Sequence, residues 1–315
     1  MALPDGMTVR PATGADAAAV CALLNRVDEI ETGQPGTDLD EVEQELAHPE
    51  LDLARDSWLL HDPDGRLVGY GLVRDRSGGE RIDLDQYLLP DQLAGGLHLF
   101  DLMEARAVEL ARRNGAERAV LHLLLNTEPT TDTGSMRARG WRHVRRHHAL
   151  RREVSPHADP VPAPPAGVRL RDCAAEADRR VAHRLIQQTF AAHYDFKPRD
   201  YPQWLQDIGA ESVDWSGVWV AALDGHGDVA VLRTGQRPPA TAWAYNIGVL
   251  PEARGRGIGG HLLRHFFADA AVRGLPTAAL GVDTGNTTGA MALYLGHGME
   301  LQFAVDTWAL ELPTA

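Results

Sequence analysis

Hydrophobic and polar positions follow the same order twice along this chain. Residues 7–25 begin with a short β-like stretch and continue with apolar positions at helical spacing, and residues 167–190 repeat that pattern. In each half, two β-like runs then surround an Asp-Gly pair, at residues 64–65 and 224–225, which is typical of a hairpin turn. A further β-like run, a proline, a group of glycines and a long amphipathic helix follow. The pattern predicts that one whole domain is duplicated.

Matching positions place the two halves in register. Leu89-Pro90 corresponds to Leu250-Pro251, and each half continues with another apolar run, a short helix and a β-like tail. Strands and helices mix within each half. We therefore expect an α/β (α+β) fold of two tandem domains, each a mixed, mostly antiparallel sheet flanked by helices.

A proline-rich segment separates the halves. Five prolines fall between residues 156 and 165, where neither a helix nor a central strand can continue. We expect a first domain over residues 1–154, a linker over 155–166 and a second domain over 167–315.

The most distinctive stretch is VLPEARGRGIGGHLL, residues 249–263, between a predicted strand and a predicted helix. Its glycines can take positive φ, so that successive N–H groups turn toward one point. The following helix adds unpaired N–H groups and the positive end of its dipole, and nearby arginines can bind the same anion. This junction predicts a pyrophosphate-binding loop, with a solvated glycine-rich turn as the alternative. The residues concerned are Arg254, Gly255, Arg256, Gly257, Gly259 and Gly260.

At these residues the chain resembles the GNAT superfamily of acyl-coenzyme A-dependent N-acyltransferases. The family's motif Gln/Arg-x-x-Gly-x-Gly/Ala matches residues 254–259, after Val249-Leu250-Pro251. Residues 282–299 resemble its Asn…Ala…Leu-Tyr…Gly pattern, with Met299 in place of the usual aromatic residue. More weakly, the whole chain resembles the tandem, two-domain members of the family, of which mycothiol synthase is an example.

The resemblance implies acetyl-coenzyme A as co-substrate and no metal ion. It implies that main-chain N–H groups before the loop polarise the thioester carbonyl, at a strand bulge that Gly248 would favour. It also implies that Tyr294 protonates the departing thiolate, although a half-buried aromatic packing role is the alternative. The residues expected to bind the coenzyme are Ile247, Gly248, Val249, Arg254, Gly255, Arg256, Gly257, Ile258, Gly259, Gly260 and Asn286.

The strand before the loop departs from the family pattern. Trp243 stands where many relatives carry a glutamate, so a general base has to come from elsewhere or act through water. Tyr245 is the nearest candidate on that strand, and His193 and Asp195 follow the first helix of the second half, where relatives build the acceptor site. Trp243, His193 and Asp195 are candidate substrate contacts. For His193, a solvent-facing position at a helix end is the alternative.

The first half departs further. Leu93 stands where the second half has Arg254, and Met136 stands where it has Tyr294. Leucine cannot hold an anion, and methionine cannot donate a proton to sulfur. We expect the first domain to be degenerate and non-catalytic, although it could still hold a coenzyme without turning it over.

Composition and charge narrow the class of partner. The 315 residues carry a formal net charge of -13, which argues against nucleic acid. No apolar run is long enough to span a membrane and no signal-peptide layout is present, so we expect a cytoplasmic protein. We expect an N-acetyltransferase, monomeric or homodimeric, in which a primary amine of a small molecule attacks acetyl-coenzyme A directly. An acyl-coenzyme A-binding regulatory module with little turnover and an acyl-coenzyme A hydrolase are the alternatives.

Overall fold

The computed structural model describes residues 3–75, 78–194, 196–237, 240–285 and 288–315. The chain forms two compact units. Unit 1 contains residues 1–147 together with 303–315, and unit 2 contains residues 148–302. These bounds differ from the expected ones, because the proline-rich linker lies inside unit 2 and the C-terminal segment belongs to unit 1. The reason is a long-range strand pairing, which local sequence patterns do not encode.

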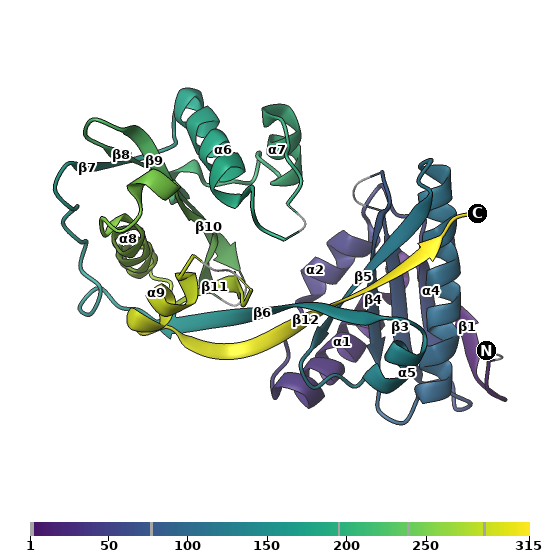
Figure 1. Cartoon of the computed structure of the whole chain (residues 1–315). Coiled ribbons are helices and arrows are strands. Elements are labelled where there is room, and N and C mark those ends of the chain that lie inside the picture. Colours follow the sequence, from purple (N-terminus) through teal and green to yellow (C-terminus); the bar gives the residue numbers. More distant parts are fainter. Residues whose placement is uncertain (1–2, 76–77, 195, 238–239, 286–287) are drawn as a thin grey trace. The chain divides into compact units, whose positions relative to one another are not determined.

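Unit 1 is a sheet with helices on both faces (Figure 1). Its elements are β1 (Thr8–Arg10), η1 (Gly14–Asp16), α1 (Ala17–Thr32), α2 (Leu39–Leu46), α3 (Leu53–Asp56), β2 (Ser57–His61), β3 (Leu67–Arg74), β4 (Arg81–Leu88), α4 (Leu93–Arg113), β5 (Arg118–Asn126), α5 (Thr133–Ala138), β6 (Arg142–Glu153) and β12 (Glu300–Pro313). The strand order is β1-β2-β3-β4-β5-β12-β6, with β4 and β5 parallel. Separate apolar cores lie under α1 and α2 on one face and under α4 on the other.

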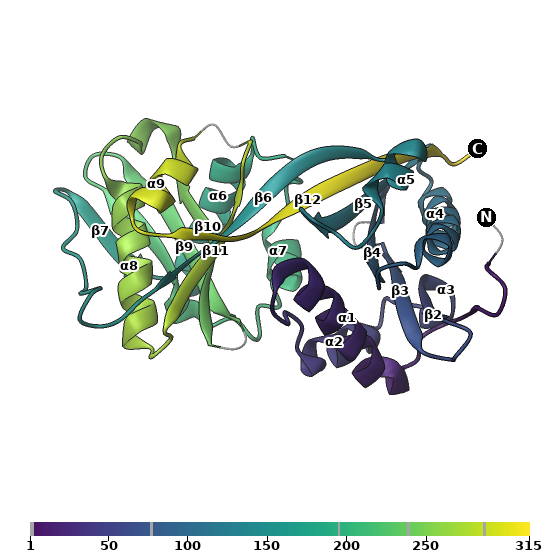
Figure 2. The ribbon, with the colours of Figure 1, turned by 90° about the horizontal axis from the view of Figure 1, so that it is seen from below.

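Unit 2 repeats this plan (Figure 2). Its elements are β7 (Val168–Asp172), α6 (Glu176–Phe190), α7 (Tyr201–Asp207), η2 (Trp215–Gly217), β8 (Val218–Leu223), β9 (Gly227–Arg237), β10 (Thr241–Val249), η3 (Pro251–Ala253), α8 (Ile258–Val272), β11 (Thr277–Asp283) and α9 (Ala290–Gly296). Its sheet begins with the second part of β6, residues 148–153, which belongs to this unit. The strand order is β6-β11-β10-β9-β8-β7, with β10 and β11 parallel and the β7–β10 neighbours antiparallel. α6 and α8 cover opposite faces. The expected fold class is confirmed for both units.

The local elements follow the sequence pattern closely. In α1 the buried side chains Val20, Leu23, Leu24 and Val27 recur at helical spacing, and in β4 buried and partly exposed positions alternate. The predicted hairpins join β2 to β3 and β8 to β9. Among the described residues, no helix is long and apolar enough to cross a membrane.

The last strand of the chain completes the sheet of unit 1. β12 pairs antiparallel with β5 from Val305 opposite Asn126 to Pro313 opposite Arg118. Trp308 on this segment is 3% exposed and packs in the core beneath α4. Unit 1 is therefore built from the two ends of the chain, and its C-terminal strand is the element that moves the domain boundary.

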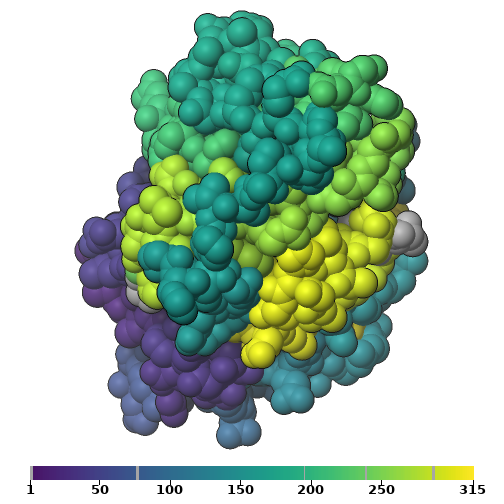
Figure 3. Space-filling model, turned by 90° about the vertical axis from the view of Figure 1, so that its left-hand side faces the viewer, coloured from purple at the N-terminus to yellow at the C-terminus, as the bar shows by residue number. Residues whose placement is uncertain are grey.

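The proline-rich segment, residues 155–166, forms neither helix nor strand, as predicted. Figure 3 shows it in teal along the surface of unit 2. Asp159 holds it in place, because this buried carboxylate accepts hydrogen bonds from the Arg152 guanidinium at 2.6 Å and from the Ser155 N–H at 3.1 Å. The segment is consequently part of the packing of unit 2 rather than a free tether.

Candidate active site

The loop between β10 and α8 has a backbone that glycine adopts readily. Gly255 has φ 75° and Gly257 has φ 76°, both in the left-handed region. A Cβ atom built at either position would meet no atom within 4 Å, so packing does not demand glycine there. The conformation of the main chain is what requires these residues, and the space beside them is open to a ligand.

The start of α8 presents free N–H groups next to this loop. The first helical hydrogen bond runs from the His261 N–H to the Gly257 carbonyl at 3.0 Å. The N–H groups of residues 258–260 therefore have no carbonyl one turn earlier in the helix, and they lie at the positive end of its dipole. Arg254 lies at the same loop, where its Nε donates to the Val249 carbonyl at 3.1 Å, and Arg256 is exposed. This arrangement fits a pyrophosphate group.

Gly260 makes room for the end of α9 beside the start of α8. A Cβ there would lie 3.2 Å from the His297 Nε2, whereas a Cβ at Gly259 would make an ordinary contact with the Leu293 Cδ2 at 3.4 Å. The small size of Gly260 thus helps α9, which carries Tyr294, to lie close to the start of α8.

β10 separates from β11 halfway along its length. Parallel pairing between them covers only Thr241–Ala244, whereas pairing of β10 with β9 continues to Val249. The register with β9 shifts between Ala244 and Asn246, so Tyr245 is the extra residue of a β-bulge. Past the bulge, the edge of β10 that faced β11 is no longer paired with that strand. The edge includes residues 247–249, which were expected to bind the thioester.

The sequence suggested a bulge at Gly248, but the bulge lies at Tyr245 instead. Gly248 pairs with Val231 in regular register. Its lack of a side chain has another cause, because a Cβ there would lie 2.3 Å from the Thr189 Oγ1 and 2.8 Å from its Cβ. Gly248 thus lets α6 lie directly against β10.

Tyr294 is buried on α9, with 7% of its surface exposed. Burial raises its pKa to about 12, so the phenol is protonated throughout the neutral range. The hydroxyl makes no hydrogen bond with any residue that the structure describes, which leaves its proton available to a ligand. The proton-donor role stays a prediction.

His193 follows α6 and is half-buried, with its ring centroid 4.4 Å from that of Phe190. Burial lowers its pKa; the charge of Asp283 at the end of β11 opposes this shift, and the charge of Arg254 in the loop adds to it. His193 is therefore near both the end of β11 and the glycine loop, rather than being a solvent-facing histidine. Asp195 and Asn286 lie outside the described residues.

Trp243 and Tyr245 are each covered by an arginine. The Arg233 guanidinium lies 4.4 Å from the Tyr245 ring centroid, and that of Arg237 lies 4.0 Å from the Trp243 ring centroid. Neither arginine was predicted from the sequence. The signal available was the change from apolar to alternating polar residues near the end of β9.

Unit 1 shares the separation of strands, because β4 pairs with β5 only over Arg81–Leu84, but it lacks the bulge and the glycine loop at the corresponding positions. β4 pairs with β3 without a register shift, and Tyr87 stands where unit 2 has Gly248. Gly95 and Gly96 lie in α4, where a Cβ would meet Leu60 at 2.6 Å and Leu88 at 2.5 Å respectively. These glycines therefore serve packing, unlike the loop glycines of unit 2.

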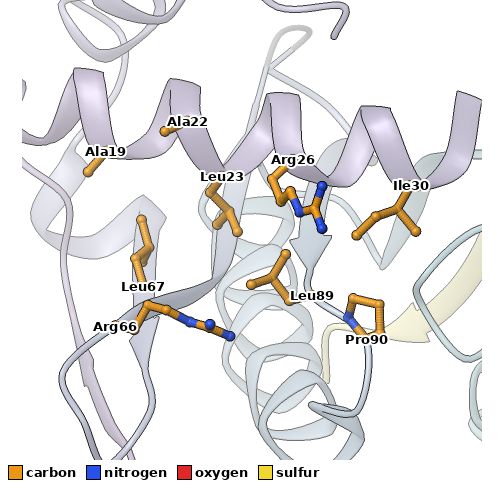
Figure 4. Close-up of a pocket in the computed structure, with 9 residues that line it drawn as sticks. All are labelled: Ala19, Ala22, Leu23, Arg26, Ile30, Arg66, Leu67, Leu89 and Pro90. Atoms are coloured by element: carbon orange, nitrogen blue, oxygen red, sulfur yellow. The ribbon is translucent and has the colours of Figure 1, made fainter. Parts of the chain in front are cut away.

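Unit 1 has a pocket of its own, of about 550 Å³, between α1 and the ends of β3 and β4 (Figure 4). Two guanidinium groups reach toward a mostly apolar lining. Arg26 also pairs with Glu29 at 3.1 Å, and Arg66 pairs with Asp62 at 3.7 Å. The lining residues are Ala19, Ala22, Leu23, Arg26, Ile30, Arg66, Leu67, Leu89 and Pro90.

A family model matches the segment that contains the site of unit 2. Residues 180–299 match the acetyltransferase (GNAT) family. The segment begins in α6 and ends just before β12, so it includes the glycine loop, the bulge and α9.

Two relatives with curated names share part of the chain. A mycothiol acetyltransferase of Thermobispora bispora is 30% identical over 191 residues, which cover 53% of this chain and 63% of that protein. A mycothiol acetyltransferase of Streptomyces bingchenggensis is 27% identical over 258 residues, which cover 76% of each. The match to the first relative thus spans less than two thirds of its length.

Solved structures share the fold over nearly the whole chain. A GCN5-related N-acetyltransferase from Sphaerobacter thermophilus has a TM-score of 0.85 at 24% identity, covering 99% of this chain and 98% of its own. A tandem GNAT protein from the clavulanic acid biosynthesis pathway has a TM-score of 0.65 at 20% identity, covering 97% and 98%. At these identities the likeness concerns the fold.

Proposed function

From the match of residues 180–299 to the acetyltransferase (GNAT) family, we propose that the protein moves an acetyl group from acetyl-coenzyme A to a primary amine of a small molecule. Catalysis takes place in unit 2. The observation that carries this proposal is the loop of Gly255 and Gly257, whose positive φ values and open surroundings lie directly before the free N–H groups of α8.

Main-chain groups bind the coenzyme. The N–H groups at the start of α8 receive the diphosphate, with Arg254 and Arg256 as neighbouring cations. The released edge of β10, residues 247–249, offers hydrogen bonds to the pantetheine arm and to the thioester carbonyl. Donors held rigidly by a strand stabilise the oxyanion that forms during acyl transfer without reorganising.

His193 and Tyr294 move the protons. The amine nitrogen attacks the thioester carbon, and the C–S bond then breaks. His193, whose pKa burial lowers, is neutral at neutral pH and accepts the proton that the nitrogen loses, directly or through water. Tyr294, protonated because burial raises its pKa, donates a proton to the departing sulfur. Proton exchange with solvent then restores both groups.

Unit 1 is the non-catalytic partner in this proposal. Its β4 has no bulge, Tyr87 takes the place of Gly248, and its glycines pack against leucines instead of shaping a loop. Unit 1 therefore lacks the loop that is proposed to receive the diphosphate in unit 2, although its β4 also separates from β5.

Calorimetry with acetyl-coenzyme A and thiol release over a panel of primary amines test the function together. The panel includes amino acids, aminosugars and mycothiol-related amines, because the two relatives bear that name. We expect binding and amine-dependent release. In Tyr294→Phe we expect kcat to fall by about 100-fold, the usual scale for a lost proton donor, with coenzyme affinity within about twofold.

Each other outcome points to a different function. Absence of coenzyme binding would refute the proposal. Tight binding without any accepted amine would favour a regulatory module, and thiol release that needs no amine would identify a hydrolase.

A further inference from the structure

Two arginines and two aromatic rings form a ladder across β9 and β10. Arg233 and Arg237 are four residues apart on β9, so their side chains share one face. The Tyr245 ring lies between them, with centroid distances of 4.4 Å to the Arg233 guanidinium and 5.3 Å to that of Arg237. Trp243 supports Arg237 from β10 at 4.0 Å. Cation–π contacts of this length hold the guanidinium groups in defined positions.

Gly235 makes room for this ladder. It lies between the two arginines on the same face of β9, and a Cβ atom there would come within 2.9 Å of the Tyr245 Cε2. The bulge at Tyr245 and the missing side chain at Gly235 together allow the ring to lie over β9. The ladder thus depends on local features of both strands.

Arg233 has no carboxylate partner among the described residues. Its Nε donates to the Asn246 Oδ1 at 3.0 Å, and its two terminal nitrogens make no hydrogen bond with that part of the chain. The side chain is half-buried, and burial lowers its pKa. By contrast, Arg171 in the same unit pairs with Asp178 and Asp228, both at 2.7 Å. The terminal nitrogens of Arg233 are not buried, so they are accessible to a ligand, and a partly desolvated cation gains from pairing with an anion.

The ladder lies beside the point where the thioester is expected. Val231, two residues before Arg233, packs in the core under α6, so alternation places Arg233 on the α6 face. Arg233 is opposite Asn246 in the β9–β10 register, next to the bulge where β10 leaves β11. His193, the proposed base, follows α6. An acceptor that extends from His193 along the α6 face of β10 toward the bulge would reach Arg233.

We propose that the acceptor amine carries a carboxylate, which the two terminal nitrogens of Arg233 bind as a forked pair, with Arg237 as a second cation nearby. Tyr245 and Trp243 orient the guanidinium groups and supply an apolar surface to the body of the acceptor. The substrate class is thus that of amino acids and related amino carboxylates. This inference rests on the proposed acetyl transfer at the same site.

Matched acceptors test the inference. Thiol release is measured for α-, β- and γ-amino acids, each against its own carboxamide, which keeps the amine and loses the charge. We expect kcat/KM to favour the carboxylate by at least about tenfold, the scale of one charge-assisted hydrogen-bond pair. In Arg233→Gln the KM of the carboxylate members should rise by about 10- to 100-fold, and the ratio should fall toward one. Arg233→Lys keeps the charge but cannot form the forked pair of hydrogen bonds, so its KM for the carboxylate members should lie between those of the wild type and Arg233→Gln.

Arg180→Gln is the control, because Arg180 also lies over a tyrosine ring, that of Tyr201 at 4.3 Å, but far along α6 from the bulge. It should leave the ratio unchanged. Equal use of acids and carboxamides, or an unaltered ratio in Arg233→Gln, overturns the inference while acetyl transfer stands. A preference for phosphoethanolamine over β-alanine that Arg233→Gln removes overturns it in favour of phosphate.

Two further measurements distinguish a failure of the proposed acetyl transfer from a failure of carboxylate recognition. Calorimetry with acetyl-coenzyme A on the wild type and Arg233→Gln detects loss of coenzyme binding directly. Without turnover, saturation-transfer NMR of N-acetyl amino acids against their carboxamides still reports carboxylate binding. A stronger signal for the carboxylates than for the carboxamides that is lost in Arg233→Gln supports the inference. Equal signals for the two kinds of ligand in the wild type refute it.

Discussion

Glycines at the candidate site of unit 2 act through two different physical properties. Gly255 and Gly257 are needed for their positive φ, since nothing lies near their missing side chains. Gly235, Gly248 and Gly260 have no positive φ and are needed because another side chain occupies the space of a Cβ. A glycine-rich motif in sequence does not distinguish the two uses, yet the consequences of substitution differ.

Gly257→Val should selectively weaken coenzyme binding. The left-handed backbone costs a β-branched residue about 1–2 kcal/mol, and the side chain would cover the N–H groups at the start of α8. We expect the dissociation constant of acetyl-coenzyme A to rise at least about tenfold by calorimetry. Gly274→Val is matched, because Gly274 also has a φ of 74° and open surroundings, but at the far end of α8. Equal affinities in the two variants would contradict the pyrophosphate assignment.

His193 should produce an acid limb in the pH profile. Its pKa is lowered by burial, so the base is neutral near pH 7 and is lost only as the pH falls through that lowered pKa. With an acceptor amine of low pKa, kcat/KM should therefore decline in acid below the ordinary imidazole range. His193→Gln should remove this limb, whereas His226→Gln, in the exposed turn between β8 and β9, should retain it. An unchanged limb in His193→Gln would exclude His193 as the base.

At the scale of elements, β10 organises the candidate site. Its first residues pair with both β9 and β11, the bulge at Tyr245 follows, and its last residues pair with β9 alone. α6 lies against it at Gly248, and α8 begins after the loop. One strand thus positions the glycine loop, the released edge and the arginine ladder, which explains why its irregularities coincide with the proposed chemistry.

Gly248→Ala should loosen the packing of α6 on β10. The new Cβ would come 2.3 Å from the Thr189 Oγ1, so the helix or the strand must shift. Overpacking of this kind costs about 1–3 kcal/mol, measurable as a lower free energy of unfolding in urea. Removing the hydroxyl in Gly248→Ala/Thr189→Ala should restore part of the loss. Full stability in the single variant would show that α6 adjusts without strain.

At the scale of the whole molecule, a segment that follows unit 2 along the chain belongs to unit 1. The C-terminal strand β12 belongs mainly to unit 1, where residues 305–313 pair with β5. Folding of unit 1 therefore requires residues that follow those of unit 2 along the chain. Such a long-range pairing has a high loop-closure cost and forms late by comparison with local hairpins.

Trp308→Ala should destabilise unit 1. The indole is 3% exposed within the core under α4, and a large-to-small change of this type costs about 3–5 kcal/mol. Hydrogen exchange should show faster exchange in α4 and β5. Leu301→Ala, on the same strand but 54% exposed, is the control and should leave exchange unchanged. Normal protection of α4 and β5 in Trp308→Ala would show that unit 1 does not depend on β12.

The amino-acid sequence by itself determined the duplicated α/β fold, the two hairpins, the irregular linker and the glycine loop before α8. Each of these depends on neighbours along the chain, through side-chain periodicity, turn preferences or φ freedom. Only the tertiary structure decided the place of the bulge, the close contact at Gly248, the arginine ladder and the return of β12 to unit 1. These depend on strand register and on atoms far apart in sequence, which local patterns do not specify because many pairings satisfy the same alternation of apolar and polar residues.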